Sequence, residues 1–242
     1  MGFMVSIGNL RLGGIPRVAG VIVDGWNKAI VDRAVAEGAD LLELRIDCFK
    51  SLKEERVLEA VTKIKKRGLP LIATIRKKEE GGKKSIDDKR RLQLFKKVIP
   101  LVDAVDIELG SSRILKDVID LAHRMDKKVI VSYHNFKTTP GEKVLEGVVK
   151  RGKVVKGDIV KIATMARNRT DILRLLRITA RYKNLITICV GRMGAISRVL
   201  FPLMGSLITY GSLGSATAPG QLSLVTIKEQ LRLYYTGYRP RS

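Results

Sequence analysis

The sequence is poor in cysteine, in aromatic residues and in long apolar runs. Cysteine occurs only as Cys48 and Cys189, each inside a short apolar run, which favours a reduced, cytoplasmic protein over one held together by disulfides. No apolar run reaches the ~18 residues of a membrane span, and the first residues lack a signal-peptide pattern. Aromatic residues make up only 5% of the chain, which argues against stacking platforms for single-stranded nucleic acid.

Acidic residues are also scarce relative to basic ones. Lys and Arg number 46 against 24 Asp and Glu, so the net charge is +22. Such an excess is one property of nucleic-acid-binding proteins. Most basic residues, however, lie among glutamates in amphipathic stretches such as residues 53–67, a pattern typical of solvated helix faces and of heat-adapted proteins. We therefore expect neither nucleic acid nor a membrane as a partner, and keep nucleic-acid binding as the weaker alternative.

Short apolar runs, in contrast, are abundant, and they alternate with helical stretches. The eight runs are centred near Val21, Leu42, Ile72, Val105, Ile130, Ile159, Ile186 and Ile208. Helical periodicity follows each run, over residues 27–37, 53–67, 87–98, 112–125, 142–151, 170–182, 195–203 and 221–235, with Thr170 predicted as an N-cap. Eight strands that are each followed by a helix pair in parallel through right-handed crossovers.

This pattern predicts an α/β fold. The simplest closure of eight such units is a (β/α)₈ TIM barrel, and an open doubly wound sheet is the weaker alternative. Residues 1–16 carry turn signals at Gly8-Asn9 and Gly13-Gly14, which predict an N-terminal β-hairpin before the barrel.

One of the eight runs contains a cationic side chain. In residues 157–164, Lys161 shares a face with Ile159 and Ala163, and the opposite face is apolar too, so the strand is expected to be covered on both sides. Burial disfavours the charged form of an amine. We therefore expect the pKa of Lys161 to fall towards neutrality, as a Schiff-base lysine requires. The alternative is a lysine at the strand end whose head group reaches into water.

Polar residues gather at the carboxyl ends of the predicted strands, where barrel enzymes have their active sites. His134 ends the strand next to that of Lys161, and neighbouring strands lie ~4.8 Å apart. An imidazole beside a desolvated amine is the pairing that imine chemistry requires. We therefore predict that the two side chains share a pocket. A charged loop with two glycines, residues 77–82, follows the third strand and is a possible lid.

Together these strand ends resemble those of the type I 3-dehydroquinate dehydratases. The matching pieces are Glu43-Leu44-Arg45-Ile46-Asp47, Arg76 with Glu80-Gly81-Gly82, Asp106-Ile107-Glu108, Ser132-Tyr133-His134-Asn135-Phe136, Asp158-Ile159-Val160-Lys161-Ile162-Ala163, Ile196-Ser197-Arg198 and Ala218-Pro219-Gly220-Gln221. The resemblance covers almost the whole chain. It implies a single catalytic domain over residues 1–242, a homodimer, no metal or organic cofactor, and dehydration of 3-dehydroquinate to 3-dehydroshikimate in the shikimate pathway of aromatic amino acid biosynthesis.

The resemblance also implies a role for each matching residue. Lys161 would form an imine with the substrate ketone, and His134 would be the general base, oriented by Glu80. Arg198 would bind the substrate carboxylate through its two-pronged guanidinium. The remaining substrate-binding residues that the resemblance implies are Glu43, Arg45, Arg76, Thr217 and Gln221.

Four positions depart from the family's pattern. Val21 stands where a serine is frequent, Val190 lies in a stretch that often carries methionines, Tyr210 replaces a phenylalanine, and Thr217 replaces a serine. These changes put local packing and affinity in question but leave the lysine and histidine in place.

A second enzyme class remains open from the residues alone. A class I aldolase-like barrel would use Lys161 on a phosphorylated sugar, with the phosphate held by glycine-rich loops after the seventh and eighth strands. Arg198 and Glu43 favour a carboxylated polyol instead, so we treat the aldolase as the alternative.

Overall fold

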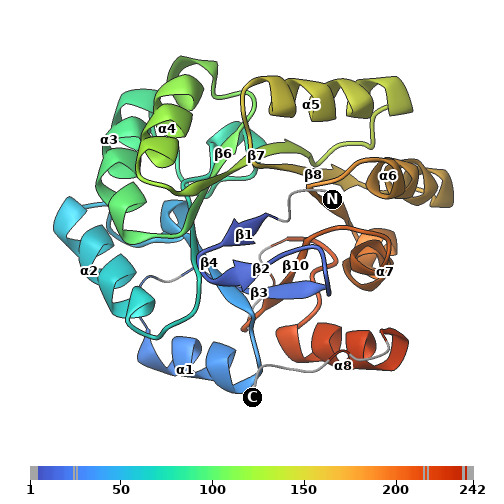
Figure 1. The fold of residues 1–242 in the computed structure, drawn as a ribbon, viewed down its shortest axis with the longest axis horizontal. Coiled ribbons are helices and arrows are strands. Elements are labelled where there is room, and N and C mark those ends of the chain that lie inside the picture. Colours follow the sequence, from blue (N-terminus) through green and yellow to red (C-terminus); the bar gives the residue numbers. More distant parts are fainter. Residues whose placement is uncertain are drawn as a thin grey trace.

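A computed structural model describes residues 5–23, 25, 27–214, 216, 218–235 and 238 (Figure 1). Within these residues, eight parallel strands form one sheet in the order β10-β3-β4-β5-β6-β7-β8-β9. The strands are β3 (Arg17–Ile22), β4 (Leu41–Arg45), β5 (Leu71–Thr74), β6 (Ala104–Glu108), β7 (Lys128–Asn135), β8 (Ile159–Met165), β9 (Leu185–Val190) and β10 (Ile208–Ser212). The two end strands meet where the backbone N–H of Leu207 donates to the carbonyl of Leu185 at 2.8 Å, which brings the sheet round into a barrel.

Helices surround this sheet, and one follows each strand (Figure 1). The α-helices are α1 (Lys28–Ala36), α2 (Glu54–Lys65), α3 (Asp88–Val98), α4 (Ser112–Arg124), α5 (Glu142–Val154), α6 (Arg169–Arg181), α7 (Ser197–Leu203) and α8 (Leu224–Tyr234). Short 3₁₀ turns are η1 (Ile46–Cys48), η2 (Lys78–Glu80), η3 (Ile99–Leu101) and η4 (Met193–Ile196). The predicted (β/α)₈ barrel is therefore confirmed. No helix in the described part of the chain is long and apolar enough to cross a membrane.

The predicted N-cap of α6 was wrong. The helix begins at Arg169, and its cap is Asn168, whose side-chain oxygen accepts a hydrogen bond from the backbone N–H of Asp171 at 3.0 Å. Thr170 already lies inside the first turn. Asn is at least as good a cap as Thr, so the earlier residue determines where the helix starts.

Strand alternation separates two apolar layers. On β8, Ile159 and Ala163 belong to a buried cluster inside the barrel, whereas Val160 and Ile162 belong to a cluster that includes residues of α5 and α6. Lys161 lies between Ile159 and Ala163 on the inward face, as the sequence predicted.

The predicted N-terminal hairpin is present as β1 (Ser6–Ile7) and β2 (Leu10–Arg11), which pair antiparallel. Its residues Ile7 and Leu10 are buried in the same cluster as the inward-facing residues near the strand starts, which include Leu41, Ile72, Ala104, Ile130, Ile159, Ile186 and Ile208. The hairpin therefore closes the amino-terminal end of the barrel, and it leaves the other end open for a site.

Three aspartates link neighbouring strands at this amino-terminal end. Each immediately precedes a strand and exchanges two hydrogen bonds with one residue of the strand before it. In each pair the aspartate N–H donates to that residue's carbonyl at 2.9–3.0 Å, and the residue's N–H donates to the carboxylate at 2.8 Å. The pairs are Asp40 with Val18, Asp103 with Leu71 and Asp158 with Val129.

Candidate active site

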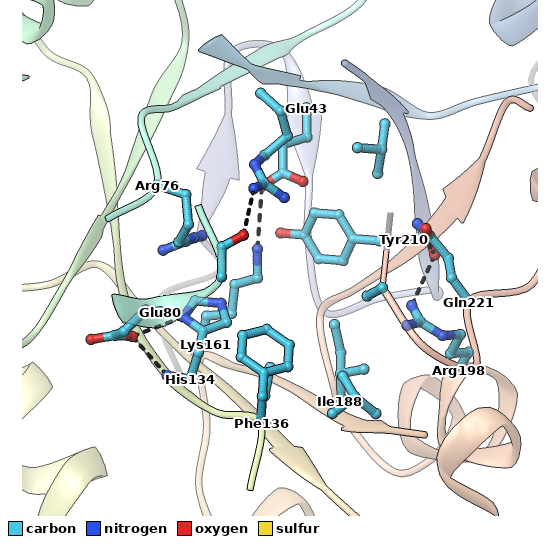
Figure 2. A pocket seen from close by; sticks show the side chains of 16 residues that line it. Glu43, Arg76, Glu80, His134, Phe136, Lys161, Ile188, Arg198, Tyr210 and Gln221 are labelled. Atoms are coloured by element: carbon cyan, nitrogen blue, oxygen red, sulfur yellow. Dashed lines mark hydrogen bonds and ion pairs between the residues drawn. The ribbon is translucent and has the colours of Figure 1, made fainter. Parts of the chain in front are cut away.

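A pocket lies at the carboxyl ends of the strands, on the side away from the hairpin (Figure 2). Its empty volume, including the part open to solvent, is about 560 Å³. Eight of the nine predicted site residues line it, namely Glu43, Arg45, Arg76, Glu80, His134, Lys161, Arg198 and Gln221. The ninth, Thr217, lies outside the described residues.

Lys161 stands in the middle of the pocket and is only 5% exposed. Its Nζ lies 3.0 Å from Oδ2 of Asp106 and 3.3 Å from Oε1 of Glu43. Burial lowers the pKa of Lys161, but these two carboxylates outweigh burial and raise the pKa above its ordinary value. The expectation of a neutral resting amine was therefore wrong, and so was the alternative of a head group in water. The amine is buried and charged.

Asp106 is the functional residue that the sequence reasoning did not assign. It lies on β6, fully buried, and its Oδ1 accepts hydrogen bonds from Ser132 at 2.6 Å and from Nη2 of Arg76 at 2.9 Å. Burial raises the pKa of Asp106, but Arg76 and Lys161 outweigh this and hold it well below its ordinary range. The signal was present in the sequence, because Asp106 and Glu108 alternate on one face of a strand, but only the packing shows which cation each carboxylate meets.

Arg76 is engaged in this ion network. Beside its contact with Asp106, its Nη1 lies 3.0 Å from Oε1 of Glu108. Glu108 is in turn bonded to the fully buried guanidinium of Arg91 on α3, which also donates to the carbonyl of Ile75. A chain of alternating charges thus runs from the pocket to the helix layer and fixes Asp106 beside the amine, while Glu43 accepts a hydrogen bond from Thr74 at 2.9 Å.

His134 and Glu80 form a partly buried pair beside the amine. The register of β7 and β8 places Ser132 next to Lys161 and His134 next to Ala163, so histidine and lysine come from adjacent strands as predicted. Oε2 of Glu80 accepts from the backbone N–H of His134 at 2.8 Å and lies 3.0 Å from its Nδ1 (Figure 2). With the ring proton on Nδ1, the other ring nitrogen is left as an acceptor.

The electrostatics of this pair favour an uncharged imidazole. Burial lowers the pKa of His134 well below its ordinary value, and the positive charges of Arg76 and Lys161 lower it further. Burial, reinforced by the negative charge of Glu108, raises the pKa of Glu80 to about 7. His134 is therefore a neutral base at neutral pH, and its partner carboxyl titrates in that range.

The loop that carries Glu80 is held against the pocket wall. Arg45 makes a bidentate ion pair with Asp47, at 3.0 and 2.9 Å, and donates to the carbonyl of Gly81 at 3.3 Å. Gly81 has a φ of 88°, and a Cβ there would approach the ring of Phe136 to 2.6 Å, so this position requires glycine. Phe136 stacks on His134 with ring centroids 6.0 Å apart. The expected lid loop, residues 77–82, thus lies against His134. Arg45 helps to hold it there through the hydrogen bond to Gly81.

Arg198 forms the opposite wall and differs from every other cation of the pocket. It lies on α7, 2% exposed, and donates to the carbonyls of Gly220 at 2.9 Å and Tyr210 at 3.1 Å. In the described ranges no carboxylate pairs with it. Burial lowers the pKa of Arg198 to about 10, so it stays charged at neutral pH. A buried cation that contacts only carbonyls is suited to an incoming anion.

Gln221 and three of the four departures also line the pocket. The side-chain amide of Gln221 donates to the carbonyl of Tyr210 at 3.5 Å, beside Arg198. Val21, Val190 and Tyr210 line the cavity, so these three departures face the space where a ligand would bind, and the fourth, Thr217, lies outside the described residues. Within the part of the chain that the structure describes, no group of three or more His, Cys, Asp or Glu side chains is arranged to hold a metal ion.

These features define a class of protein. A closed parallel barrel carries an amine, a neutral imidazole and a guanidinium without a carboxylate partner in the described ranges, all around one cavity at the carboxyl ends of its strands, which is where barrel enzymes act. The family model described as Type I 3-dehydroquinase matches residues 26–238, and the chain belongs to this family.

Individual relatives agree. The chain is 40% identical over 218 residues to the 3-dehydroquinate dehydratase of Thermodesulfovibrio yellowstonii, covering 89% of this chain and 94% of that protein. The crystal structure of 3-dehydroquinate dehydratase from Geobacillus kaustophilus superposes with a TM-score of 0.91 at 27% identity, over 98% of both chains. The type I enzyme from Clostridium difficile, solved with covalent modified comenic acid, gives a TM-score of 0.90 at 29% identity, over 99% of this chain and 100% of that one. These likenesses support the dehydratase prediction and not the aldolase alternative.

Proposed function

We propose that this protein is a hydro-lyase that removes water from 3-dehydroquinate to give 3-dehydroshikimate, a step of the shikimate pathway. The observation that carries the proposal is the shared pocket of Lys161 and His134, which face one cavity from adjacent strands with Arg198 across it. Membership of the type I 3-dehydroquinase family supports the choice of substrate.

Lys161 would attack the ketone carbon and form an imine. Attack requires the lone pair of the amine, so the resting ammonium must first release a proton, and the neutral imidazole of His134 is the base in the same pocket. The positively charged iminium then draws electrons from the neighbouring carbon and acidifies its C–H bond.

His134 would take that proton and later return one to the departing hydroxyl group. Glu80 supports both roles because its hydrogen bonds to Nδ1 and to the backbone N–H fix the ring orientation. Hydrolysis of the product imine frees Lys161 for the next turnover.

Arg198 would bind the substrate carboxylate, since among the described residues only backbone carbonyls accept hydrogen bonds from this buried cation. The groups that would surround the ring hydroxyls are Glu43, Arg45, Arg76, Gln221 and Thr217. Glu43 also holds the amine, at 3.3 Å, so substrate binding and amine positioning would be coupled through it.

We further propose a single catalytic domain over residues 1–242, a homodimer and a cytoplasmic location. The hairpin shares a buried cluster with the barrel interior, which supports one folding unit. Both cysteines are unpaired, as in most proteins of a reducing compartment. Size-exclusion chromatography with light scattering measures the molecular mass in solution, and a mass equal to one chain would contradict the dimer.

The decisive experiment follows the conjugated enone product by ultraviolet absorbance after addition of 3-dehydroquinate. A parallel sample is reduced with borohydride and digested, and we expect a stable adduct on the peptide that contains Lys161. Phosphorylated sugars should give neither signal. Absence of both product and adduct with 3-dehydroquinate would refute the proposed function, and a filter-binding titration with nucleic acid should show only weak, salt-sensitive association.

A further inference from the structure

The side chain of Tyr210 is buried in the pocket with an unused hydroxyl. The residue lies on β10 and is 3% exposed, and its hydroxyl makes no hydrogen bond of normal geometry with a described residue, although the ammonium of Lys161 interacts with it. Buried hydroxyl groups normally have a partner, because leaving one unpaired is unfavourable.

The hydroxyl lies next to the reacting amine. The Nζ of Lys161 lies 4.1 Å from the centroid of the Tyr210 ring, and the hydroxyl end of the ring reaches into the centre of the pocket beside that amine (Figure 2). A ketone placed for attack by Lys161 must bring its oxygen into this same small region. Glu43 and Asp106, which flank the amine, are carboxylates and therefore only accept hydrogen bonds.

Tyr210 is suited to donate. Burial raises the pKa of Tyr210 above its ordinary value, although Lys161 opposes this, so the phenol keeps its proton throughout the neutral range. An oxygen that gains negative charge during attack needs a donor that is already in place. Tyr210 is a neutral donor beside the amine, and its hydroxyl proton has no acceptor in the described structure, because the ammonium of Lys161 can only donate.

The protons needed for imine formation can all come from the ammonium, so the phenol does not have to release its own proton. The C–N bond forms as the π electron pair of the ketone moves to oxygen, and the C–O bond then breaks as water leaves. A protonated amine and a ketone give an iminium and water, so both protons of that water come from the ammonium. What the step requires from the pocket is stabilisation of the oxygen while charge develops on it.

We propose that Tyr210 is a catalytic residue of imine formation and hydrolysis, whose hydroxyl donates a hydrogen bond to the oxygen on the carbon that Lys161 attacks. The inference rests on the proposed function and adds a group to that site. The hydroxyl stays protonated and stabilises first the developing alkoxide and then the carbinolamine oxygen.

Tyr238 provides a matched control. It is also buried, its hydroxyl also lacks a partner among the described residues, and the Nζ of the buried Lys228 lies 5.2 Å from its ring centroid. It does not line the active-site pocket. Replacing either tyrosine with phenylalanine removes one unpaired buried oxygen and keeps the shape of the ring.

The test compares Tyr210→Phe and Tyr238→Phe with the wild-type protein in single turnovers, quenched with borohydride at successive times and analysed for the Lys161 adduct. We expect the adduct to form at least about tenfold more slowly in Tyr210→Phe, as for loss of one donor to a developing oxyanion, and at the wild-type rate in Tyr238→Phe. Because imine formation then limits turnover, the isotope effect of substrate deuterated at the carbon that loses its proton should fall towards one in Tyr210→Phe.

Two results would overturn the inference. One is adduct formation in Tyr210→Phe at the wild-type rate, and the other is a change confined to KM, which would place the hydroxyl against a different part of the substrate. Both presuppose a wild-type adduct and therefore leave the proposed function intact. If the wild-type protein itself forms no adduct with 3-dehydroquinate, the proposed function and this inference fail together.

Discussion

The two ends of the barrel contain nearly the same groups in different surroundings. At the carboxyl end Lys161 is bonded to an aspartate and lies against the ring of a tyrosine, and at the amino-terminal end Lys228 has the same two kinds of neighbour. Both lysines are at most 5% exposed. Each end also has a histidine bonded to a carboxylate, His134 with Glu80 and His123 with Asp158.

The two ends differ in the charges beside the lysine and in whether the lysine faces a cavity. Lys228 shares Asp40 with Arg17 and with a backbone N–H, and burial outweighs the carboxylate and lowers the pKa of Lys228. Lys161 has two carboxylates, its pKa is raised, and it faces a cavity. A buried lysine with an acidic partner is therefore not by itself a reactive group. What distinguishes the carboxyl end is room for a substrate, a neutral imidazole and a guanidinium that, within the described structure, bonds only to carbonyls.

The largest contrast should come from replacing each lysine with methionine. Lys161→Met removes the only nucleophile of the proposed imine, so we expect no product in the ultraviolet assay. Lys228→Met should keep the wild-type turnover per folded molecule but unfold at a lower urea concentration, because breaking a buried ion pair costs about 3–5 kcal/mol. Turnover in Lys161→Met, or loss of activity in folded Lys228→Met, would contradict the assignment of Lys161 as the reactive lysine and of Lys228 as a structural one.

The two histidines give the next contrast. His134→Ala should lower kcat by about 10²–10⁴-fold, the range for loss of a general acid–base group, while still giving the borohydride adduct at Lys161. His123→Ala, on α4 with an exposed ring, should retain full activity. Steady-state kinetics and mass spectrometry measure both effects, and wild-type turnover without His134 would exclude it as the base.

The arginines should separate binding from chemistry. Loss of a charged hydrogen bond of about 1.5–3 kcal/mol in Arg198→Ala corresponds to a rise of about 10–150-fold in KM, with anionic inhibitors weakened in proportion. Arg17→Ala, at the amino-terminal end, should leave KM unchanged. Equal inhibitor affinity in the wild-type protein and in Arg198→Ala would remove Arg198 as the carboxylate site.

The smallest effect concerns pH. The pKa of Glu80 is raised to about 7, so below this pH the carboxyl is protonated and accepts the hydrogen bonds of His134 more weakly than the carboxylate does. We expect kcat/KM to fall a few-fold as pH drops through 7, and this limb should be absent in Glu80→Gln, which is slower throughout.

The free energy of unfolding should also depend on the ionisation of Glu80, but it should change with pH in the opposite direction to kcat/KM. A carboxyl whose pKa rises from 4.5 to about 7 on folding binds a proton more tightly in the folded state. Its contribution is present below pH 4.5 and is lost as pH rises towards 7, so activity gains where stability declines. Urea unfolding of the wild-type protein and of Glu80→Gln across this window checks the sign, and parallel curves would contradict it.

The sequence predicted the barrel because its strands and helices are short-range patterns that repeat eight times. It also predicted that Lys161 and His134 would meet, because consecutive units place their strands side by side. The charge state of Lys161 was out of reach, since Asp106 and Glu43 arrive from two other strands and burial alone pointed the wrong way. The unpaired hydroxyl of Tyr210 was equally hidden, because a missing partner is a property of packing.

Asp158 bears on catalysis although it lies far along the strand from the reacting groups. Its two hydrogen bonds with Val129 join β8 to β7 where the two strands begin. They fix the register of the pair, and with it the direction of every later side chain of both strands. A slip by one position would turn Lys161 from the cavity to the helix layer, because side chains alternate between faces. Hydrogen bonds at the closed, amino-terminal end of the barrel therefore determine which side chains face the cavity at the other end.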